Sequence, residues 1–274
     1  MTPLGDGLVL VVGGIATGLF GSLLGLGGGV LIVPLLTLVM GFPLLTAVGV
    51  SLICVIVTSG AAAGVYLERR VANLRLGMSL ELFTAIGALA GGLIAFAIPE
   101  RVLEFAFAVL LVYTSLTMLR RREAAAADAD VIAEAAPGER PAFVERLSGP
   151  GYTVRRLGAG VAGSVGAGVA SALLGIGGGL IKVPLMHVVM GVPLRVATAT
   201  SNLMIGITAS ASAIVYLLRG GIQGFVAAPS AIGVFIGASI GSRIASRIDL
   251  RILRGLFVAI LLYTAFQMLL RAIG

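Results

Sequence analysis

The sequence predicts an all-α polytopic membrane protein built from two inverted-topology repeats of about five helical segments each. Hydrophobic residues make up 58% of the 274 residues and charged residues only 11%, whereas soluble domains carry about 25% charged residues. The stretch from Gly7 to Leu67 contains no Asp, Glu, Lys or Arg. A glycine-rich motif that begins at Gly25 recurs at Gly175, which indicates a duplicated unit.

Charges and turn residues divide the chain into apolar segments near residues 7–24, 30–40, 44–67, 79–98, 102–119, 157–174, 180–190, 194–218, 224–242 and 252–270. Most approach the roughly 17–25 residues that a membrane-spanning helix requires. Segments 30–40 and 180–190 are shorter and would rise only about 16 Å as α-helices. We expect each of these two to be a half-helix that follows a glycine-rich break.

The repeated motif reads Gly-x-Gly-Gly-Gly-x-x-x-x-Pro and covers Gly25–Pro34 and Gly175–Pro184. Further matches keep the same offset: Met40-Gly41-Phe42-Pro43-Leu44 with Met190-Gly191-Val192-Pro193-Leu194, Ser51 with Ser201, Tyr66 with Tyr216, and Tyr113 with Tyr263. We therefore predict a first transmembrane repeat over 1–119, a water-exposed cytoplasmic linker over 120–156 whose composition is compatible with some helix, and a second transmembrane repeat over 157–274.

Arginines indicate how the two repeats face the membrane. The loop after the third segment of the first repeat holds Arg69, Arg70 and Arg75, whereas the matching loop of the second repeat holds Arg219. In the next loop the second repeat has more arginines than the first, namely Arg243, Arg247, Arg251 and Arg254. Because arginine-rich loops stay in the cytoplasm, we expect opposite orientations, both termini outside, and segments 7–40 and 157–190 that each enter and leave on one face.

Composition also excludes several kinds of site. Cys54 and His187 are the only cysteine and histidine, which excludes a disulfide framework and a multi-histidine metal site within the chain. We expect Cys54 to be a packing residue and His187 to bond another helix. Acidic residues fall almost wholly in loops, and no nucleophile with a base and an acid stands in the apolar segments. We therefore expect neither an enzyme nor a cofactor, and no nucleic-acid partner.

The two glycine runs are candidate anion sites. Consecutive glycines interrupt a helix, and the half-helix that follows begins with unpaired N–H groups and the positive end of its dipole. In an inverted repeat two such breaks can meet near the middle of the membrane. We expect Gly27, Gly28 and Gly29 to bind an anion together with Gly177, Gly178 and Gly179. The alternative is close helix packing, which we expect for Gly233, Gly237 and Gly241.

Lys182 is the only lysine and follows the second glycine run by three residues. A cation inside an apolar segment costs at least about 2.5–3.5 kcal/mol and therefore has a ligand or a counter-ion. Extension of the side chain to the membrane surface is the alternative. Ile32 stands at the matching position of the first repeat, so the predicted site is asymmetric.

A polar stripe follows the second motif. Thr198, Ser201 and Asn202 lie at i, i+3 and i+4 of one predicted helix, and Ser51 is the polar counterpart of Ser201 in the first repeat. Hydrogen bonding between helices explains such residues as well as substrate contact does. We include all four residues in the candidate substrate site.

The paired glycine-proline motifs resemble the sulfite exporter TauE/SafE family over about residues 7–119 and 157–271. The resemblance implies transport of sulfite, sulfoacetate or related organosulfonates across the bacterial inner membrane. We expect a small anion and the lipid bilayer as partners, and the sequence is compatible with a homodimer. An anion channel and a carrier of carboxylates remain alternatives, ahead of a membrane scaffold or an enzyme.

Overall fold

The chain forms a bundle of helices that follow the predicted segments. The computed structural model describes residues 3–24, 29–68, 72–127, 147–149, 152–244 and 250–273. The elements are α1 Pro3–Leu24, α2 Gly29–Pro34, η1 Leu35–Val39, α3 Leu44–Glu68, α4 Leu74–Ala95, α5 Glu100–Ala127, α7 Leu157–Leu174, α8 Gly179–Pro184, η2 Leu185–Val189, α9 Leu194–Leu218, α10 Gly224–Ile244 and α11 Leu250–Ile273. Eight of these described helices are long and apolar enough to cross a membrane. The protein is a multi-pass membrane protein with an all-α fold, as predicted.

The two largest differences from the predicted segments are at the start of α4 and the end of α5. α4 begins at Leu74 rather than at residue 79, because the side chain of Asn73 accepts a hydrogen bond from the backbone N–H of Leu76 at 3.0 Å and caps the helix. α5 continues past residue 119 to Ala127, into the predicted linker. Both errors come from ending a segment at its charged residues, although a helix can carry charges at its ends.

The end of the predicted linker packs against the bundle. Leu147 and Val154 are buried in one apolar cluster with Leu76, and the side-chain amide of Asn73 donates to the carbonyl of Leu147 at 2.8 Å. The prediction of a water-exposed linker is therefore wrong for these residues, because their apolar side chains cover the start of α4. Residues 128–146 lie outside the described part of the chain.

Each predicted half-helix consists of a six-residue α-helix and a five-residue π-helix. The π-type bonds join Met40 N to Leu35 O at 3.3 Å and Met190 N to Leu185 O at 3.1 Å. In the first repeat the π-helix lies close along α1, because a Cβ added at Gly13 would come within 2.5 Å of the Leu35 side chain. α7 and η2 make the same contact at the matching positions in the second repeat.

The two repeats build one bundle by pairing helices across the duplication. α1 packs along α10, α4 along α7, α3 against α9 and α5 against α11. A Cβ added at Gly233 or Gly237 would lie 2.2 or 2.1 Å from a backbone carbonyl of α1, and one at Gly241 would lie 2.1 Å from Ser22 Oγ. The packing role predicted for these three glycines is confirmed, since small residues allow two helix backbones to approach closely.

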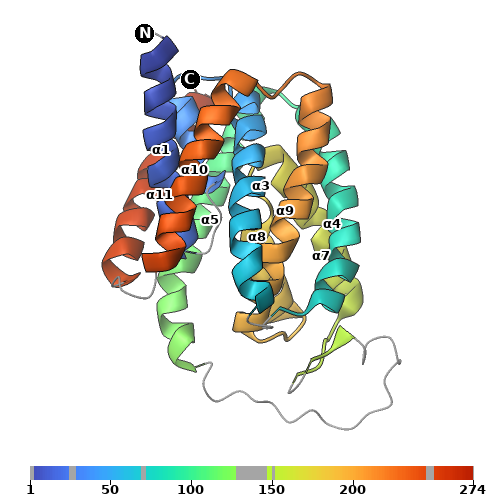
Figure 1. Cartoon of the computed structure of the whole chain (residues 1–274). Coiled ribbons are helices and arrows are strands. Elements are labelled where there is room, and N and C mark those ends of the chain that lie inside the picture. Colours follow the sequence, from blue (N-terminus) through green and yellow to red (C-terminus); the bar gives the residue numbers. More distant parts are fainter. Residues whose placement is uncertain are drawn as a thin grey trace.

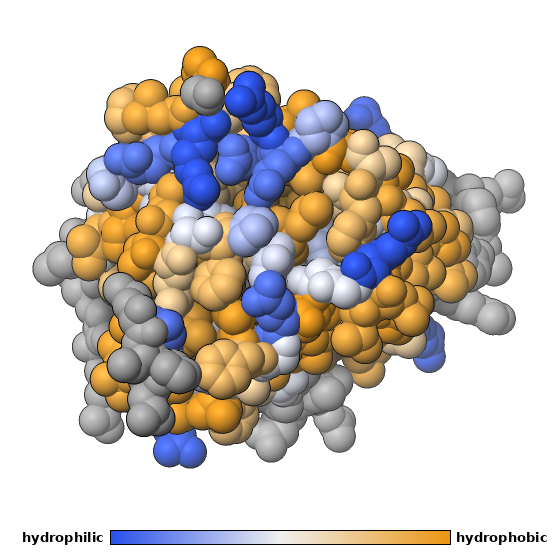
Figure 2. All heavy atoms as spheres, turned by 90° about the horizontal axis from the view of Figure 1, so that it is seen from above, coloured by the Kyte–Doolittle hydropathy of each residue, from blue (hydrophilic) through white to orange (hydrophobic). Residues whose placement is uncertain are grey.

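Figure 1 places both chain termini at one end of the bundle, whereas α5 ends and α7 begins at the opposite end. Figure 2 views the end that carries the termini, where hydrophilic residues gather across the face and hydrophobic residues surround them. Large apolar side chains such as Leu8, Leu82 and Phe266 are exposed on the helices. This distribution is that of a bundle whose sides face lipid.

The inverted orientation of the repeats is a prediction that labelling can test. Single cysteines at positions 70 and 247, which lie outside the described residues, should react with an impermeant thiol reagent only from the cytoplasm. A cysteine at Arg219, the exposed residue after α9, should react only from outside. The native Cys54 is fully buried and serves as the unreactive background. Labelling of positions 70 and 219 from the same side would contradict the inverted repeat.

Candidate functional site

The two glycine-rich breaks lie next to each other inside the bundle. The hydroxyl oxygen of Ser51 on α3 lies 2.7 Å from the carbonyl oxygen of Gly175 and 3.1 Å from that of Gly29. A Cβ added at Gly29 would lie 2.7 Å from the same Gly175 carbonyl. Ser51 therefore links the start of α2 to the end of α7. Gly27 and Gly28 lie outside the described residues.

The second break requires glycine because of its backbone conformation. Gly175, Gly177 and Gly178 have φ angles of 69°, 71° and 77°, in a region that side chains with a Cβ disfavour. Gly178 is the N-cap of α8. Gly179 and Leu180 are the first two residues of α8, and their N–H groups have no hydrogen-bond acceptor within the helix.

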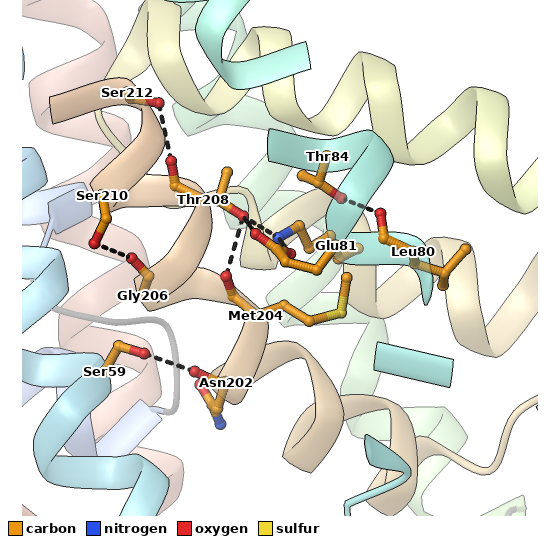
Figure 3. A network of polar contacts seen from close by, with 11 residues as sticks. Ser59, Leu80, Glu81, Thr84, Asn202, Met204, Gly206, Thr208, Ser210 and Ser212 are labelled. Carbon is orange, nitrogen blue, oxygen red and sulfur yellow. Dashed lines mark hydrogen bonds and ion pairs between the residues drawn. The ribbon is translucent and has the colours of Figure 1, made fainter. Parts of the chain in front are cut away.

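A buried ion pair lies one turn into α8. Lys182 Nζ lies 2.9 Å from Glu81 Oε2 of α4 and also donates to the hydroxyl of Thr208 on α9. Thr208 in turn donates to Glu81 Oε1 at 2.6 Å, and Figure 3 shows these two side chains pointing toward one another from α9 and α4. Both carboxylate oxygens of Glu81 thus receive a hydrogen bond, one of them from a cation.

The ion pair is enclosed by protein. The side chains of Lys182 and Glu81 are 1% and 3% exposed, so the alternative that Lys182 extends to the membrane surface is wrong. A Cβ added at Gly178 would lie 3.3 Å from Lys182 Cε, which places the lysine stem directly beside the glycine break. The cation has the counter-ion that its burial requires, and its contact with substrate stays a prediction.

Two buried hydroxyls without a partner flank the same break. A Cβ added at Gly178 would lie 3.4 Å from Ser171 Cβ, and one at Gly179 would lie 3.6 Å from Ser201 Oγ. Ser171 and Ser201 are 0% and 1% exposed. Neither hydroxyl has a hydrogen-bond partner in the described part of the chain. Because buried polar groups are nearly always bonded, these two are available to a bound molecule.

The other predicted residues lie around this centre. The carbonyl of Asn202 accepts a hydrogen bond from Ser59 at 2.7 Å and joins α9 to α3, as Figure 3 shows, whereas Thr198 is half-buried near the start of α9. His187 Nδ1 lies 3.0 Å from the carbonyl of Val192, in the loop after η2, and its bond to another helix stays a prediction. Cys54 is fully buried in the apolar core, as expected of a packing residue.

Glu81, Thr208 and Ser171 are the site residues that sequence reasoning missed. Glu81 is the only acid within the predicted segment 79–98. Like Lys182, it is a single charged residue in an apolar segment, and this could have identified it as a site residue. Its position near the start of that segment allowed it to be read as a loop residue. Thr208 and Ser171 had no such signal, because hydroxyl residues are common in membrane helices.

Comparison with known proteins fits this architecture. A family model described as sulfite exporter TauE/SafE matches residues 10–268. The chain belongs to the TauE/SafE family. The probable membrane transporter protein YunE of Bacillus subtilis (strain 168) is 27% identical over 227 residues, which are 80% of this chain and 81% of that protein. No solved structure matches the chain. The TauE/SafE chain is thus a membrane transporter, and its ion pair and unpartnered hydroxyls lie where its two repeats meet.

Proposed function

We propose that the protein is a secondary transporter that carries a small sulfur-containing anion, sulfite or an organosulfonate such as sulfoacetate, across the bacterial inner membrane. The anion binds beside the second glycine break, at the interface of the two repeats. The family description supports sulfur as the central atom of the substrate. The hydrogen-bond donors of the residues beside the break support a substrate that carries a negative charge.

The observation that carries this proposal is the set of side chains with hydrogen-bond donors that lie beside Gly178 and Gly179. Lys182 passes beside Gly178, and the free hydroxyls of Ser171 and Ser201 lie on either side. The opening N–H groups of α8 add the partial positive charge of a helix end. Such a set of donors in a low-dielectric interior suits an oxyanion with several acceptor oxygens.

The enclosure of the site favours a carrier over a channel. A channel requires a continuous wet path, whereas Lys182 and Glu81 are almost fully buried. A carrier exposes its site to one side at a time and can close around it. Exchange of internal for external substrate in proteoliposomes would support the carrier.

A ligand screen tests the proposed substrate class. The purified protein is heated with sulfite, sulfate, sulfoacetate, taurine or a carboxylate analogue, and its unfolding midpoint is measured. A bound anion at 100 times its Kd stabilises the folded state by about 2.7 kcal/mol, which a thermal shift detects. We expect sulfite or an organosulfonate to give the largest shift and to be transported into proteoliposomes. A thermal shift with the carboxylate analogue alone would show that the substrate is a carboxylate and not a sulfur-containing anion. Flux at background for every anion would contradict the proposal that the protein transports anions.

A further inference from the structure

The charges around the proposed anion site already cancel. Lys182 and Glu81 form a neutral pair, and Lys182 is the charged group that contacts Glu81 among the described residues. α7, which packs along α4, carries no titratable residue over Leu157–Leu174. On α9 the titratable residues are Arg195 near its start and Tyr216 near its end, whose hydroxyl donates to the carbonyl of Ala172.

Two further titratable groups, Arg75 and His187, lie on the adjacent elements. Arg75 lies in the first turn of α4, before Glu81 on the same helix. His187 on η2 faces the carbonyl of Val192. A monovalent anion that joins the neutral Glu81–Lys182 pair would therefore leave one uncompensated negative charge in the membrane interior, and sulfoacetate, a dianion at neutral pH, would leave two. Such a charge is strongly disfavoured in a low-dielectric medium.

A proton on Glu81 would lower this excess by one negative charge and free Lys182 for the anion. Thr208 can support both protonation states of Glu81. Its hydroxyl lies 2.6 Å from Glu81 Oε1 and 3.1 Å from the carbonyl oxygen of Met204. With the carboxylate charged, Thr208 donates to Glu81. With Oε1 protonated, the new O–H donates to Thr208, and the hydroxyl proton of Thr208 turns to Met204.

A small cavity lies beside Glu81. It has a volume of about 20 Å³ and lies between α4 and α9, where Asn73, Thr200 and Glu81 contribute to its wall. Asn73 precedes α4 at the end of the bundle where the segment around Leu147 packs. The cavity thus connects Glu81 toward that end.

We propose that Glu81 is the proton-binding site of the transporter, and that anion and proton are bound together as Lys182 passes from Glu81 to the anion. This inference rests on the proposed function, because it concerns the same anion site. It names the proton as the coupled ion. The loaded site then holds a cation, an anion and a neutral carboxylic acid.

Proton uptake on anion binding tests the proposal directly. Sulfoacetate is added to the purified protein in weak buffer at neutral pH, where its charge is fixed, and a pH indicator reports protons removed from solution. We expect uptake of about one proton for each anion bound. The affinity of the wild type should fall by up to about tenfold for each pH unit at high pH, because binding and protonation are linked. Binding of sulfoacetate without proton uptake would overturn the proposal.

Two variants locate the proton. Glu81→Gln keeps the shape of the side chain and imitates the protonated acid, so this variant should bind sulfoacetate with no proton uptake and no change in affinity between pH 6 and 8. Glu104→Gln is the matched control, because Glu104 is also buried and lies 3.8 Å from Arg271, away from the break. It should still take up one proton. Uptake that persists in a folded Glu81→Gln protein would place the proton elsewhere.

The outcomes separate this proposal from the proposed function. If the wild-type protein neither binds nor transports any anion of the screen, the proposed function as an anion transporter is contradicted. If an anion binds and is transported without protons, only the coupling is contradicted. The wild-type measurement decides this even if Glu81→Gln does not fold.

Discussion

Lys182→Met is expected to weaken anion binding and to destabilise the protein. Methionine retains much of the apolar stem but lacks the ammonium group, so the anion loses a charge-assisted hydrogen bond worth about 1–3 kcal/mol. That loss corresponds to a rise in Kd of about 5- to 150-fold. Glu81 then keeps only the bond from Thr208. Breaking a buried ion pair costs about 3–5 kcal/mol of unfolding free energy.

The double variant Lys182→Met with Glu81→Gln separates the two effects. Because it contains no buried charge at this site, its thermal unfolding midpoint should return toward that of the wild type. Its anion affinity should remain as low as that of Lys182→Met. Thermal unfolding and equilibrium binding measure both quantities on the same samples. Wild-type affinity in either variant would show that Lys182 serves only as the counter-ion of Glu81.

The arrangement of apolar segments was predictable because membrane helices depend on length and composition. Segments 44–67 and 194–218 match α3 and α9 within one residue. The π-helices after Pro34 and Pro184 were not predicted, since hydropathy does not distinguish an α from a π hydrogen-bond pattern.

The partner of Lys182 was not predictable from local sequence. Glu81 lies on α4 in the first repeat and Lys182 on α8 in the second, so their contact depends on how α4 packs against α7 and α9. A single sequence does not show which residues of two packed helices from different repeats lie opposite each other. The requirement for a counter-ion was nevertheless predictable, because a buried lysine without one is too costly. A search for a single acid in another apolar segment would have identified Glu81.

The asymmetry of the duplicated motif indicates how one site arose from two breaks. Ile32 stands where the second repeat has Lys182, and both side chains are almost fully buried. Ser51 bonds the carbonyls of both breaks, whereas its counterpart Ser201 has no partner among the described residues. The first repeat therefore supplies hydrogen bonds that hold the two breaks together. The second repeat supplies the charge and the hydroxyl, unpartnered among the described residues, that the proposed site requires.

Replacement of Gly178 is expected to remove anion binding through a change confined to the glycine break. Gly178 has a φ of 77°, and a Cβ there would lie 3.3 Å from both Lys182 Cε and the carbonyl oxygen of Ala167. Gly178→Ala therefore adds backbone strain of about 1–2 kcal/mol and presses on the lysine stem. Gly178→Val adds further bulk at the same place. We expect a loss of anion binding of at least about tenfold for Ala, or about 1.4 kcal/mol, and no detectable binding for Val.

Gly220→Ala is the matched control for backbone strain without crowding. Gly220 has a φ of 71°, and no heavy atom lies within 4 Å of a Cβ added there. This variant should lose a similar amount of unfolding free energy but bind the anion as the wild type does. Thermal unfolding and binding assays on the three variants compare strain with crowding at the site. If Gly178→Ala and Gly220→Ala lose stability alike and both retain wild-type affinity, the second glycine run serves helix packing and the anion binds elsewhere.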